Sequence, residues 1–598
     1  MDYSRDSDRP VVIIGAGPAG LTAAYELAKL GRAPIVLDKA SMVGGLARTE
    51  NHAGYSFDLG GHRFFTKAKE VSQIWHEVLG KDFLRRPRLS RIYYNRKFFY
   101  YPLKPLNTLV QLGLIESILV GLSYLKWQLL PYRREDTFEQ WVTNRFGRRL
   151  FLTFFKSYTE KVWGIPCSEL KAEWAAQRIK DLSLKSVLIN MFFRPKNTIK
   201  TLIEEFDYPR RGPGMMWNAV KQAIEKRNGT VKVNQEVRRI NHNGRCIESI
   251  LVACDGEEHL VTGSHFISSM PISEFIQRLN PAPPAEVLQA AGDLRYRDFL
   301  TVCLIINKSD IFPDNWIYVH DPSVQVGRVQ NFKNWSPEMV PDPSKTSLGL
   351  EYFCNEGDEL WNTPDAGLIE LAQREIAHIG LARYEDIEDG CVVRVSHSYP
   401  VYNSDYREHL DTIRRFIGDF ENFQTIGRNG LHRYNNQDHA MLTGLFAARN
   451  IVLGTKYDLW TVNEEQEYHE EIFDGIEEQD VVAAVQNAMT EAFGKLDRFG
   501  FGLSIGITTS LVLFVSTLWL VIKGGETVGP NLQLLSQFFP GYSVTPLGSA
   551  IGLAYGFAAG FIGGYLFALA RNAALFFRLA TMRGRAERQL LSKLLDYF

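Results

Sequence analysis

The stretch at residues 11–38 constrains the fold of this chain more than any other. It begins with VVIIG, a short apolar run rich in β-branched residues, continues with GAGPAG and a helical pattern, and ends with the strand-like PIVLD. A GxGxxG motif between a strand and a helix is typical of a dinucleotide-binding α/β fold. In such a unit Gly15 permits the tight turn, Gly17 lets the backbone approach a pyrophosphate, and Gly20 lets the helix pack closely on the strand.

The start of the helix and the end of the second strand predict where the nucleotide binds. Unpaired N–H groups and the positive end of the helix dipole favour the pyrophosphate at the helix N-terminus. Asp38 ends the second strand, where its carboxylate can accept hydrogen bonds from ribose hydroxyl groups. The motif and its context together predict a dinucleotide cofactor.

The composition of the chain excludes several classes of function. Its 598 residues exceed what one hydrophobic core organises, so we expect two or three packed units. Acidic and basic residues nearly cancel, 68 against 67, which gives no electrostatic reason to expect a nucleic-acid partner. The six cysteines are scattered without a CxxC pair, so we predict no metal site and no disulfide framework, as in a reducing cytoplasm.

Two long apolar runs near the C-terminus predict a membrane anchor. Residues 499–522 and 544–570 carry no charge, and about 20 apolar residues suffice to span the hydrocarbon core. The alternative is a pair of buried core helices. Lys495 and Arg498 precede the first run and five arginines follow the second, so the positive-inside rule puts both ends in the cytoplasm. We therefore expect a catalytic domain on the cytoplasmic side of an inner or plasma membrane.

The second apolar run has small residues along one face. Gly552, Gly556, Gly560 and Gly564 recur every four residues, which brings them to the same side of a helix. Such a face allows close helix packing, either against the first run or against a second copy of the chain in a homo-oligomer.

A second glycine pair follows Asp38 in the segment KASMVGGLART. The segment resembles the cofactor loop of FAD-binding oxidoreductases of the amine oxidase type. The resemblance implies contacts with the cofactor phosphates at Gly44, Gly45 and Arg48, and backbone contacts with adenine at Val237. We expect residues 231–240 and 265–271 to be strands that close the dinucleotide-binding sheet, and we prefer FAD to NAD.

A third cluster, FDLGGHRFF, narrows the resemblance. It looks like the loop of UDP-galactopyranose mutases, especially the eukaryotic type, in which Gly60, Gly61 and His62 would pass beside the reactive edge of the flavin. Further sequence blocks between residues 10 and 455 resemble segments of the same family and occur in the same order: IYYNRKFFYYPLKP, SYTEKVWGIPCSEL, WAAQRI, YPRRGPGMMW, GRVQNFKNWSPEMVP and RYNNQDHAM.

This resemblance implies a reaction in which a pyranose becomes a furanose with no net oxidation. In that family the reduced flavin supplies the nucleophile and a nucleotide diphosphate leaves. Arg178 and Arg328 match arginines that hold the diphosphate, which the guanidinium fork suits. His62 would favour the reduced state of FAD through hydrogen bonds near the reactive edge of the ring. Tyr434 would approach the sugar diphosphate.

The C-terminal block implies further cofactor contacts. Gly427 and Arg428 resemble a flavin contact near the pyrophosphate. Asn436, Gln437 and Asp438 would lie at a helix N-terminus that faces the isoalloxazine, where the helix dipole stabilises an anionic reduced flavin.

The chain also departs from the mutase pattern. The spacing from Tyr434 to Asn-Gln-Asp is shorter, and no segment matches the one that stacks on uridine. The carrier of the sugar, nucleotide or polyprenyl, therefore stays open.

Two further apolar stretches, residues 109–130 and 186–196, have two interpretations. They either pack within the substrate domain or lie at the bilayer interface and admit a lipid-borne substrate.

The predicted architecture is an α/β fold: a Rossmann-like FAD-binding domain, an inserted α+β substrate domain and two C-terminal transmembrane helices. The FAD-binding segments are 8–105, 206–275 and 421–460, the substrate-domain segments are 106–205 and 276–420, an acidic linker covers 461–498, and the anchor covers 499–598. The leading hypothesis is an FAD-dependent sugar isomerase in cell-surface glycan synthesis. The alternative is an FAD-dependent oxidoreductase, of the amine oxidase, desaturase or protoporphyrinogen oxidase type, that acts on a membrane-soluble substrate.

Overall fold

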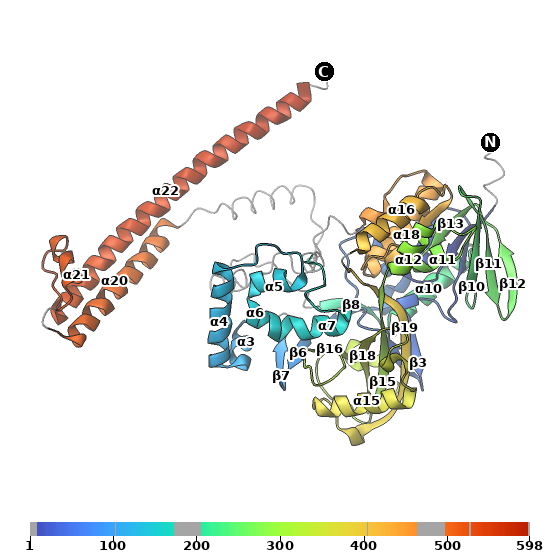
Figure 1. The fold of residues 1–598 in the computed structure, drawn as a ribbon, viewed down its shortest axis with the longest axis horizontal. Coiled ribbons are helices and arrows are strands. Elements are labelled where there is room, and N and C mark those ends of the chain that lie inside the picture. The colour runs from blue at the N-terminus through green and yellow to red at the C-terminus, as the bar shows by residue number, and fades with distance from the viewer. Residues whose placement is uncertain are drawn as a thin grey trace. The chain divides into compact units, whose positions relative to one another are not determined.

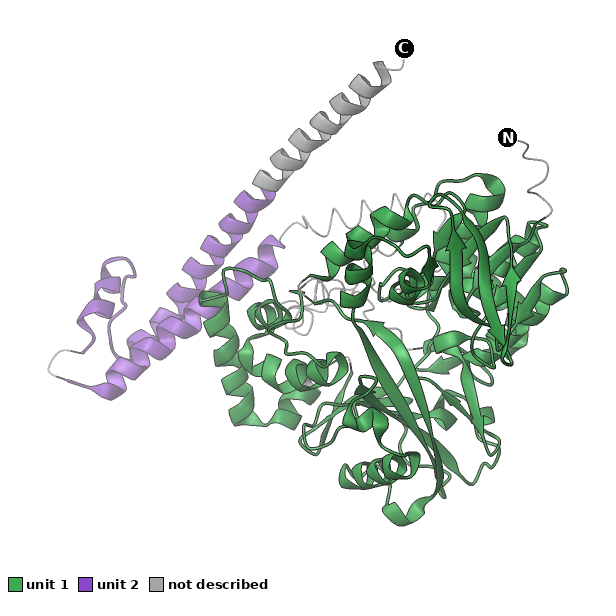
Figure 2. Ribbon diagram, turned by 45° about the vertical axis from the view of Figure 1, so that its right-hand side comes forward, with its two compact units in different colours: residues 1–472 green, residues 473–598 purple. Residues whose placement is uncertain are grey.

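A computed structural model describes residues 9–172 except 102 and 104, residues 205–462 except 404, and residues 497–595 except 526 and 527. The chain divides into two compact units, residues 1–472 and 473–598 (Figure 2). Arg178, the apolar stretch 186–196 and most of the predicted acidic linker lie outside the described residues.

A five-stranded parallel sheet forms the first layer of the first unit. Its order is β20-β13-β1-β2-β9, with β1 at Val11–Ile14, β2 at Pro34–Leu37, β9 at Thr230–Lys232, β13 at His265–Ser268 and β20 at Phe423–Thr425. Its strands come from three distant parts of the chain, as Figure 1 shows by colour. Every residue of β1 is buried, which explains its continuous apolar sequence.

Helices cover this sheet and supply one hydrophobic core. They are α1 (Pro18–Lys29), α2 (Lys69–Leu79), α10 (Pro213–Glu225) and α18 (Gln437–Leu453). The core includes Leu21, Trp75, Trp217 and Leu445, all buried. The dinucleotide motif thus lies between β1 and α1, as the sequence predicts.

One predicted strand is corrected by the structure. Residues 231–240 do not form a single strand of the parallel sheet, because the chain turns at Asn234, where φ is +55°. The Asn234 N–H donates to the Ala40 carbonyl, which fixes this turn. Beyond it, the chain joins a separate four-stranded sheet of β10 (Glu236–His242), β11 (Ile247–Cys254), β12 (Glu257–Val261) and β14 (Leu279–Asn280).

A seven-stranded mixed sheet forms the second layer, in the order β19-β15-β18-β17-β16-β6-β7. Its strands are β6 (Ser90–Tyr94), β7 (Lys97–Tyr100), β15 (Tyr296–Ile306), β16 (Trp316–Val319), β17 (Arg328–Asn331), β18 (Thr346–Cys354) and β19 (Ile387–Pro400). Helix α15 (Asp365–His378) packs on it (Figure 1). Two further sheets have two antiparallel strands each: the hairpin of β3 (Thr49–His52) and β4 (Tyr55–Asp58), and the pair of β5 (Phe83–Pro87) and β8 (Glu205–Pro209), which are distant in the sequence.

A helical group follows β7. It contains α3 (Pro105–Leu112), α4 (Leu114–Leu129), α5 (Phe138–Phe146), α6 (Arg148–Leu150), the π-helical turn η3 (Phe151–Lys156) and α7 (Ser157–Trp163). The apolar stretch 109–130 is helical but breaks at Gly113, where φ is +85°. Two more helices, α12 (Ala285–Asp293) and α16 (Tyr406–Ile417), pack against each other.

The second unit is a helical hairpin of α20 (Arg498–Lys523) and α22 (Pro546–Leu595), joined through the short α21 (Pro530–Gln533). Two segments, Arg498–Lys523 and Pro546–Ala573, are long and apolar enough to cross a membrane, with mean hydropathies of 2.2 and 1.6. Length and composition alone are weak evidence for membrane spanning. The structure does confirm that both predicted segments are helical.

The glycine face of α22 packs against α20 within the chain. A Cβ on Gly556 would lie 3.0 Å from the Ser510 Cα, and one on Gly564 would lie 3.1 Å from the Gly502 Cα. The Thr509 hydroxyl donates to the Gly556 carbonyl at 2.7 Å across this interface. The sequence allowed this face to pack against the first apolar run or against a second copy of the chain, and the structure shows it packed against the first run.

The predicted fold class is confirmed: a mixed α/β fold with two apolar C-terminal helices. The predicted domain limits stay predictions.

Candidate active site

A cavity of about 940 Å³ lies in the first unit. Residues from both large sheets and from the helical group line it. The predicted site residues among its lining are Gly15, Gly17, Asp38, Gly45, Arg48, Gly60, Gly61, His62, Val237, Arg328, Gly427, Arg428, Tyr434, Asn436, Gln437 and Asp438. The structure therefore brings together residues that are more than 400 positions apart in the sequence.

The first two glycine clusters pack on each other at one end of this cavity. Gly15 has φ +102°, and a Cβ on Gly20 would lie 1.9 Å from the Gly15 carbonyl oxygen. The Gly44 N–H donates to the Ala16 carbonyl at 2.8 Å. A Cβ on Gly45 would lie 3.1 Å from the Gly17 Cα. Gly20 and Gly44 do not line the cavity themselves, but they hold the two loops that do.

Asp38 ties these loops to the second strand. Its carboxylate accepts from the Ala16 N–H at 2.6 Å and from the Ala40 N–H at 2.8 Å. Each carboxylate oxygen has a further lone pair, so acceptor capacity remains toward the cavity. Arg48 pairs with Glu50 at 2.6 Å and donates to the Gly45 carbonyl at 3.1 Å, which keeps its cationic group beside the second loop.

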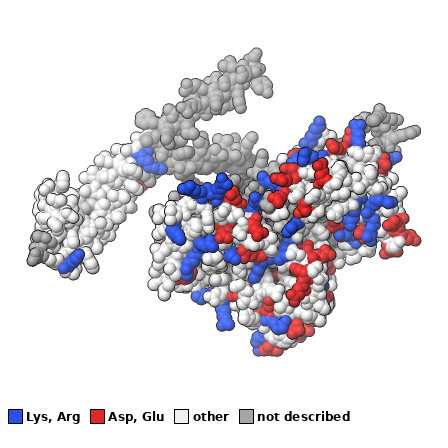
Figure 3. All heavy atoms as spheres, viewed as in Figure 1, with Lys and Arg blue, Asp and Glu red and all other residues white. Residues whose placement is uncertain are grey.

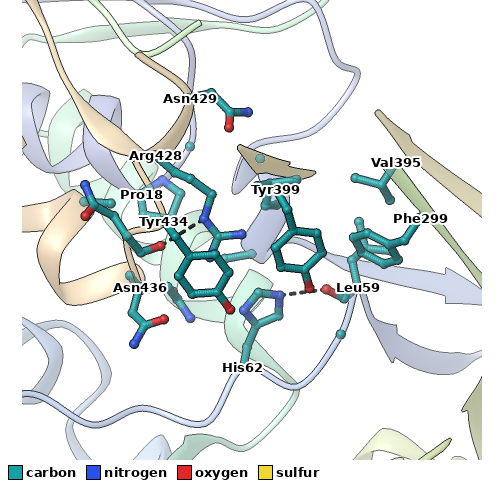
Figure 4. A pocket seen from close by; sticks show the side chains of 18 of the residues that line it. Pro18, Leu59, His62, Phe299, Val395, Tyr399, Arg428, Asn429, Tyr434 and Asn436 are labelled. Atoms are coloured by element: carbon teal, nitrogen blue, oxygen red, sulfur yellow. Dashed lines mark hydrogen bonds between the residues drawn. The ribbon is translucent and has the colours of Figure 1, made fainter. Parts of the chain in front are cut away.

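The third cluster crosses the cavity wall next to strand β17. Gly60 has φ +93°, and a Cβ on Gly61 would lie 3.0 Å from the Gln330 Nε2. The His62 Nε2–H donates to the Leu59 carbonyl at 2.9 Å (Figure 4). Burial, and the nearby cations of Arg428 and Arg328, lower the His62 pKa to about 4. The imidazole is therefore neutral at ordinary pH.

A buried carboxyl group supports this loop from behind. Asp58 accepts hydrogen bonds from the Tyr208 hydroxyl and, at 2.8 Å, from the Thr49 hydroxyl. Burial raises the Asp58 pKa to about 7. The Gly214 N–H donates to the Thr49 hydroxyl at 3.0 Å, and Gly212 leaves no room for a Cβ beside Thr49 and Asp58. The segment YPRRGPGMMW thus anchors the FDLGGH loop.

Arg328 lies buried in the cavity wall beside Glu351. Its guanidinium pairs with the fully buried Glu351 carboxylate at 2.8 Å, and the Gln330 amide donates to the same carboxylate at 2.8 Å. The Arg328 pKa is raised, with the Glu351 carboxylate opposing the burial penalty. The Arg328 Nε is buried and has no hydrogen-bond partner among the described residues. The Arg328 side chain as a whole is 16% exposed and lines the cavity, so a ligand can reach this cation.

Arg428 and two tyrosines stack over His62. The rings of Tyr399 and Tyr434 lie 5.6 Å apart and nearly parallel, and the Arg428 guanidinium carbon lies 4.7 Å from the centre of the Tyr434 ring. Arg428 donates to the Asn435 and Ser398 carbonyls at 2.9 and 3.0 Å. Figure 4 shows both phenol groups directed toward His62. Gly427 lies beside α1, since a Cβ there would be 2.9 Å from the Ala19 Cβ.

The start of α18 also borders the cavity. Asn436 is its N-cap residue, and Gln437 and Asp438 form its first turn. Like α1, this helix has no hydrogen bond from its N-cap side chain, and the Asp438 carboxylate accepts from the backbone N–H groups of Asp438 and His439. Burial raises the Asp438 pKa. The structure thus places these three residues at a helix N-terminus, as predicted.

Two more arginines lie close together near the cavity. The Arg88 guanidinium carbon lies 5.5 Å from the centre of the Trp316 ring, and that of Arg63 lies 5.9 Å from the same ring. Burial, with the neighbouring Arg63 cation, lowers the Arg88 pKa to about 10. Arg63 lines the cavity together with Tyr101 and Tyr318.

Sequence reasoning did not identify Glu351, Asp58, Tyr399 or Arg63 as site residues. The sequence did single out Glu351, because it is the one charged residue in the apolar strand TSLGLEYFC. Arg63 follows His62 directly. Tyr399 had no local signal, because strand β19 reaches the cavity only through its pairing with β15.

The chain matches the family model "Flavin containing amine oxidoreductase" over residues 18–452, which is most of its length. The chain belongs to this family. Among curated proteins, it is 24% identical to the 15-cis-phytoene desaturase of Narcissus pseudonarcissus over 410 residues, covering 63% of this chain and 67% of that protein. A desaturase of the same name from an Oncidium hybrid cultivar is 25% identical over 404 residues, covering 63% and 66%.

Solved structures share the fold. A reduced UDP-galactopyranose mutase has a TM-score of 0.67 at 20% identity, covering 78% of this chain and all of that one. A protein described as a putative protoporphyrinogen oxidase from Exiguobacterium sp. 255-15 has a TM-score of 0.59 at 15% identity, covering 75% and 100%. At these identities the likeness establishes the fold alone.

The residues that line the cavity fit FAD. The glycine loops offer backbone with no Cβ, helix α1 offers an N-terminus with no side-chain cap, and Asp38 and Arg48 offer groups for ribose and phosphate. Family and geometry agree on FAD, while the role of each residue stays a prediction.

Proposed function

We propose that this protein is an FAD-dependent isomerase that changes the ring form of a sugar linked to phosphate. The observation that carries the proposal is the Arg328 guanidinium group, which lies in the wall of the cavity on a side chain that is 16% exposed. A guanidinium fork matches phosphate oxygens and keeps its charge at any working pH. Arg63 and the neighbouring Arg88 add positive charge to the same region.

The residues of the site have distinct duties in this proposal. FAD, bound in reduced form against the glycine loops, would supply a nucleophile for the anomeric carbon. Arg328 holds the phosphate leaving group. His62 is neutral, so it adds no third positive charge beside Arg328 and Arg428. Tyr399 and Tyr434 shield the reacting sugar from water.

A second candidate is an oxidoreductase that acts on an apolar substrate. The apolar cavity lining from the helical group favours it, as does the similarity to phytoene desaturases. Such an enzyme has no use for a buried cationic donor, which is why the isomerase is preferred.

We also propose that α20 and α22 anchor the protein in an inner or plasma membrane, with the first unit on the cytoplasmic side. Their hydropathy and the flanking basic residues support this orientation. Alkaline carbonate extraction should leave the full chain in the membrane pellet. Release into the supernatant would contradict the anchor.

The isomerase is tested by incubating the full chain, chemically reduced without oxygen, with UDP-galactopyranose and with a polyprenyl-diphosphate sugar. Nuclear magnetic resonance of the sugar ring detects a furanose. Arg328→Ala should abolish the conversion, whereas Arg383→Ala, which removes an exposed arginine paired with Asp386 outside the cavity, should preserve it. Bleaching of the oxidised flavin by a polyene, with no ring conversion, would favour the oxidoreductase.

A further inference from the structure

Helix α4 presents its apolar side chains outward. Ile115 is 77% exposed and Leu122 is 57% exposed. Val120 is the only residue of this helix that is buried. The exposed apolar face of α3 and α4 consists of Leu109, Val110, Leu114, Ile115, Ile118, Leu119, Leu122, Leu125 and Leu129.

Three polar side chains of α4 form hydrogen bonds with the neighbouring helices. Glu116 pairs with Arg149 at 2.7 Å, the Ser123 hydroxyl accepts from the Arg149 N–H at 3.1 Å, and the Gln128 amide donates to the Asn144 carbonyl at 2.7 Å. These bonds fix the rotation of the helix. A surface helix of a globular protein ordinarily has the opposite arrangement, so the exposed face of α4 marks an interaction surface.

The border of this face has the composition of a membrane interface. Exposed basic residues lie on α4 and on the segments that follow it: Lys126, Arg133, Arg134 and Arg148. Figure 3 shows white surface over α4 with blue side chains at its margin. Trp127 and Tyr132 stack at the end of the helix, with ring centres 4.7 Å apart. Basic and aromatic residues beside an apolar helix face are typical of helices that lie on anionic membranes.

The inner side of the same helices lines the cavity. Leu109 and Leu112 of α3 and Val120 of α4 belong to its wall, with Phe146 and Leu150 from the neighbouring helices. Leu109 is both 41% exposed and part of the lining. Two short helices therefore separate an apolar part of the cavity from the exposed leucine face.

We infer that α3 and α4 rest on an anionic phospholipid bilayer and admit from it a substrate with a hydrocarbon chain. The chain of this amphiphile lies beside Leu112, Val120 and Phe146, and its phosphate reaches Arg328. The identity of the headgroup rests on the proposed function. The contact with the bilayer does not, because it follows from the surface of α4 alone.

The membrane contact is tested with the full chain in vesicles of phosphatidylcholine and phosphatidylglycerol that carry an alkyne-tagged phospholipid. A photoreactive benzoylphenylalanine replaces Ile115 or Leu122. The matched control replaces Leu260, which is 61% exposed on β12, and the positive control replaces Leu511 of α20, which is 53% exposed. We expect several-fold more tagged lipid on positions 115 and 122 than on position 260.

Three results would overturn the contact. Equal labelling at positions 115, 122 and 260 would show that α4 meets no lipid. Adducts with a second copy of the chain would assign the face to a homo-oligomer. Adducts with other residues of the same chain would assign it to an internal contact.

The route into the cavity is tested with a polyprenyl phosphate that carries a diazirine in its hydrocarbon chain. Peptides that contain Leu112 or Val120 should be labelled, and excess unlabelled polyprenyl phosphate should prevent it. Labelling confined to α20 and α22 would overturn the route. Neither labelling measurement needs turnover, so a failed isomerase assay leaves both labelling results valid. If either labelling measurement fails, the isomerase proposal stays open for nucleotide-linked sugars.

Discussion

The two ends of the cavity are built in different ways. At the glycine end, backbone atoms from residues 15–45 form the surface, and Gly15, Gly20 and Gly44 matter because nothing larger fits. At the arginine end, side chains from β16, β17, β19 and the loop before α18 form the surface around His62. The geometry of the glycine end requires residues without a Cβ. The geometry of the arginine end requires buried charged side chains with specific partners. Substitutions should therefore fail differently at the two ends.

The largest effect is expected at the glycine end. Gly20→Ala puts a Cβ 1.9 Å from the Gly15 carbonyl oxygen, so α1 must move away from β1. The purified variant should carry no flavin, as its visible absorbance will report. Gly292→Ala is the matched control, since a Cβ there meets nothing within 4 Å. Full flavin content in Gly20→Ala would contradict the account of this end.

At the arginine end, Arg328→Ala should reduce stability as well as activity. It leaves the buried Glu351 carboxylate without its cation, which costs about 3–5 kcal/mol in comparable pairs. Adding Glu351→Gln should restore much of the thermal midpoint but none of the activity. Calorimetry and the ring-conversion assay measure the two effects separately. Recovery of activity in the double variant would show that Arg328 acts only as a partner of Glu351.

Asp58 should make stability depend on pH. Its pKa is raised from 3.8 to about 7 by burial, so the folded state favours the protonated carboxyl group. The stabilisation is fully present below pH 4 and is lost as the pH rises toward 7. Relative to Asp58→Asn, the wild type should lose up to about 4 kcal/mol of unfolding free energy across this range. Parallel pH profiles of the two proteins would contradict a buried, protonated Asp58.

His62 should have no effect on the pH dependence of turnover near neutrality. Because its pKa is lowered to about 4, it stays neutral above that value. A profile of kcat/KM should therefore lack an inflection at the ordinary histidine pKa of about 6.5. An acidic limb near 6.5 that disappears in His62→Gln would show that the imidazole titrates in the working enzyme.

The smallest change in stability is expected for Tyr434→Phe. The ring keeps its stacking on Tyr399 and its contact with Arg428, so stability should change by less than about 1 kcal/mol. If the hydroxyl meets the sugar phosphate, KM should rise about tenfold, the effect of one lost hydrogen bond. An unchanged KM would remove Tyr434 from the substrate contacts.

The same contrast explains what could be predicted from the sequence. Gly15, Gly20 and Asp38 lie within one βαβ unit, where local spacing dictates geometry. Asn436 was predicted at a helix start from the family resemblance, and the structure places it at the N-cap of α18. Glu351 and Tyr399 could not be assigned, because their positions depend on the pairing of β15 with both β18 and β19. The single strand predicted for residues 231–240 was wrong because the turn at Asn234 divides it.

Predictions about α4 show another limit of sequence reasoning. Its hydrophobicity left both packing and membrane contact open. The structure shows which face of the helix points outward, because the hydrogen bonds of Glu116, Ser123 and Gln128 fix its rotation, and contact of that face with a membrane is the proposal made above. Arg178 lies outside the described residues, so its predicted role with Arg328 stays a prediction.

The central claim is that the site uses FAD for a conversion with no net electron transfer at the arginine end. The most direct measurement counts product molecules per flavin after anaerobic reduction, with the flavin spectrum recorded throughout. The account predicts many molecules of ring-converted sugar phosphate for each flavin, which stays reduced with no electron acceptor present. Product that never exceeds one molecule per flavin, or that appears only when oxygen or a quinone is supplied, would contradict it.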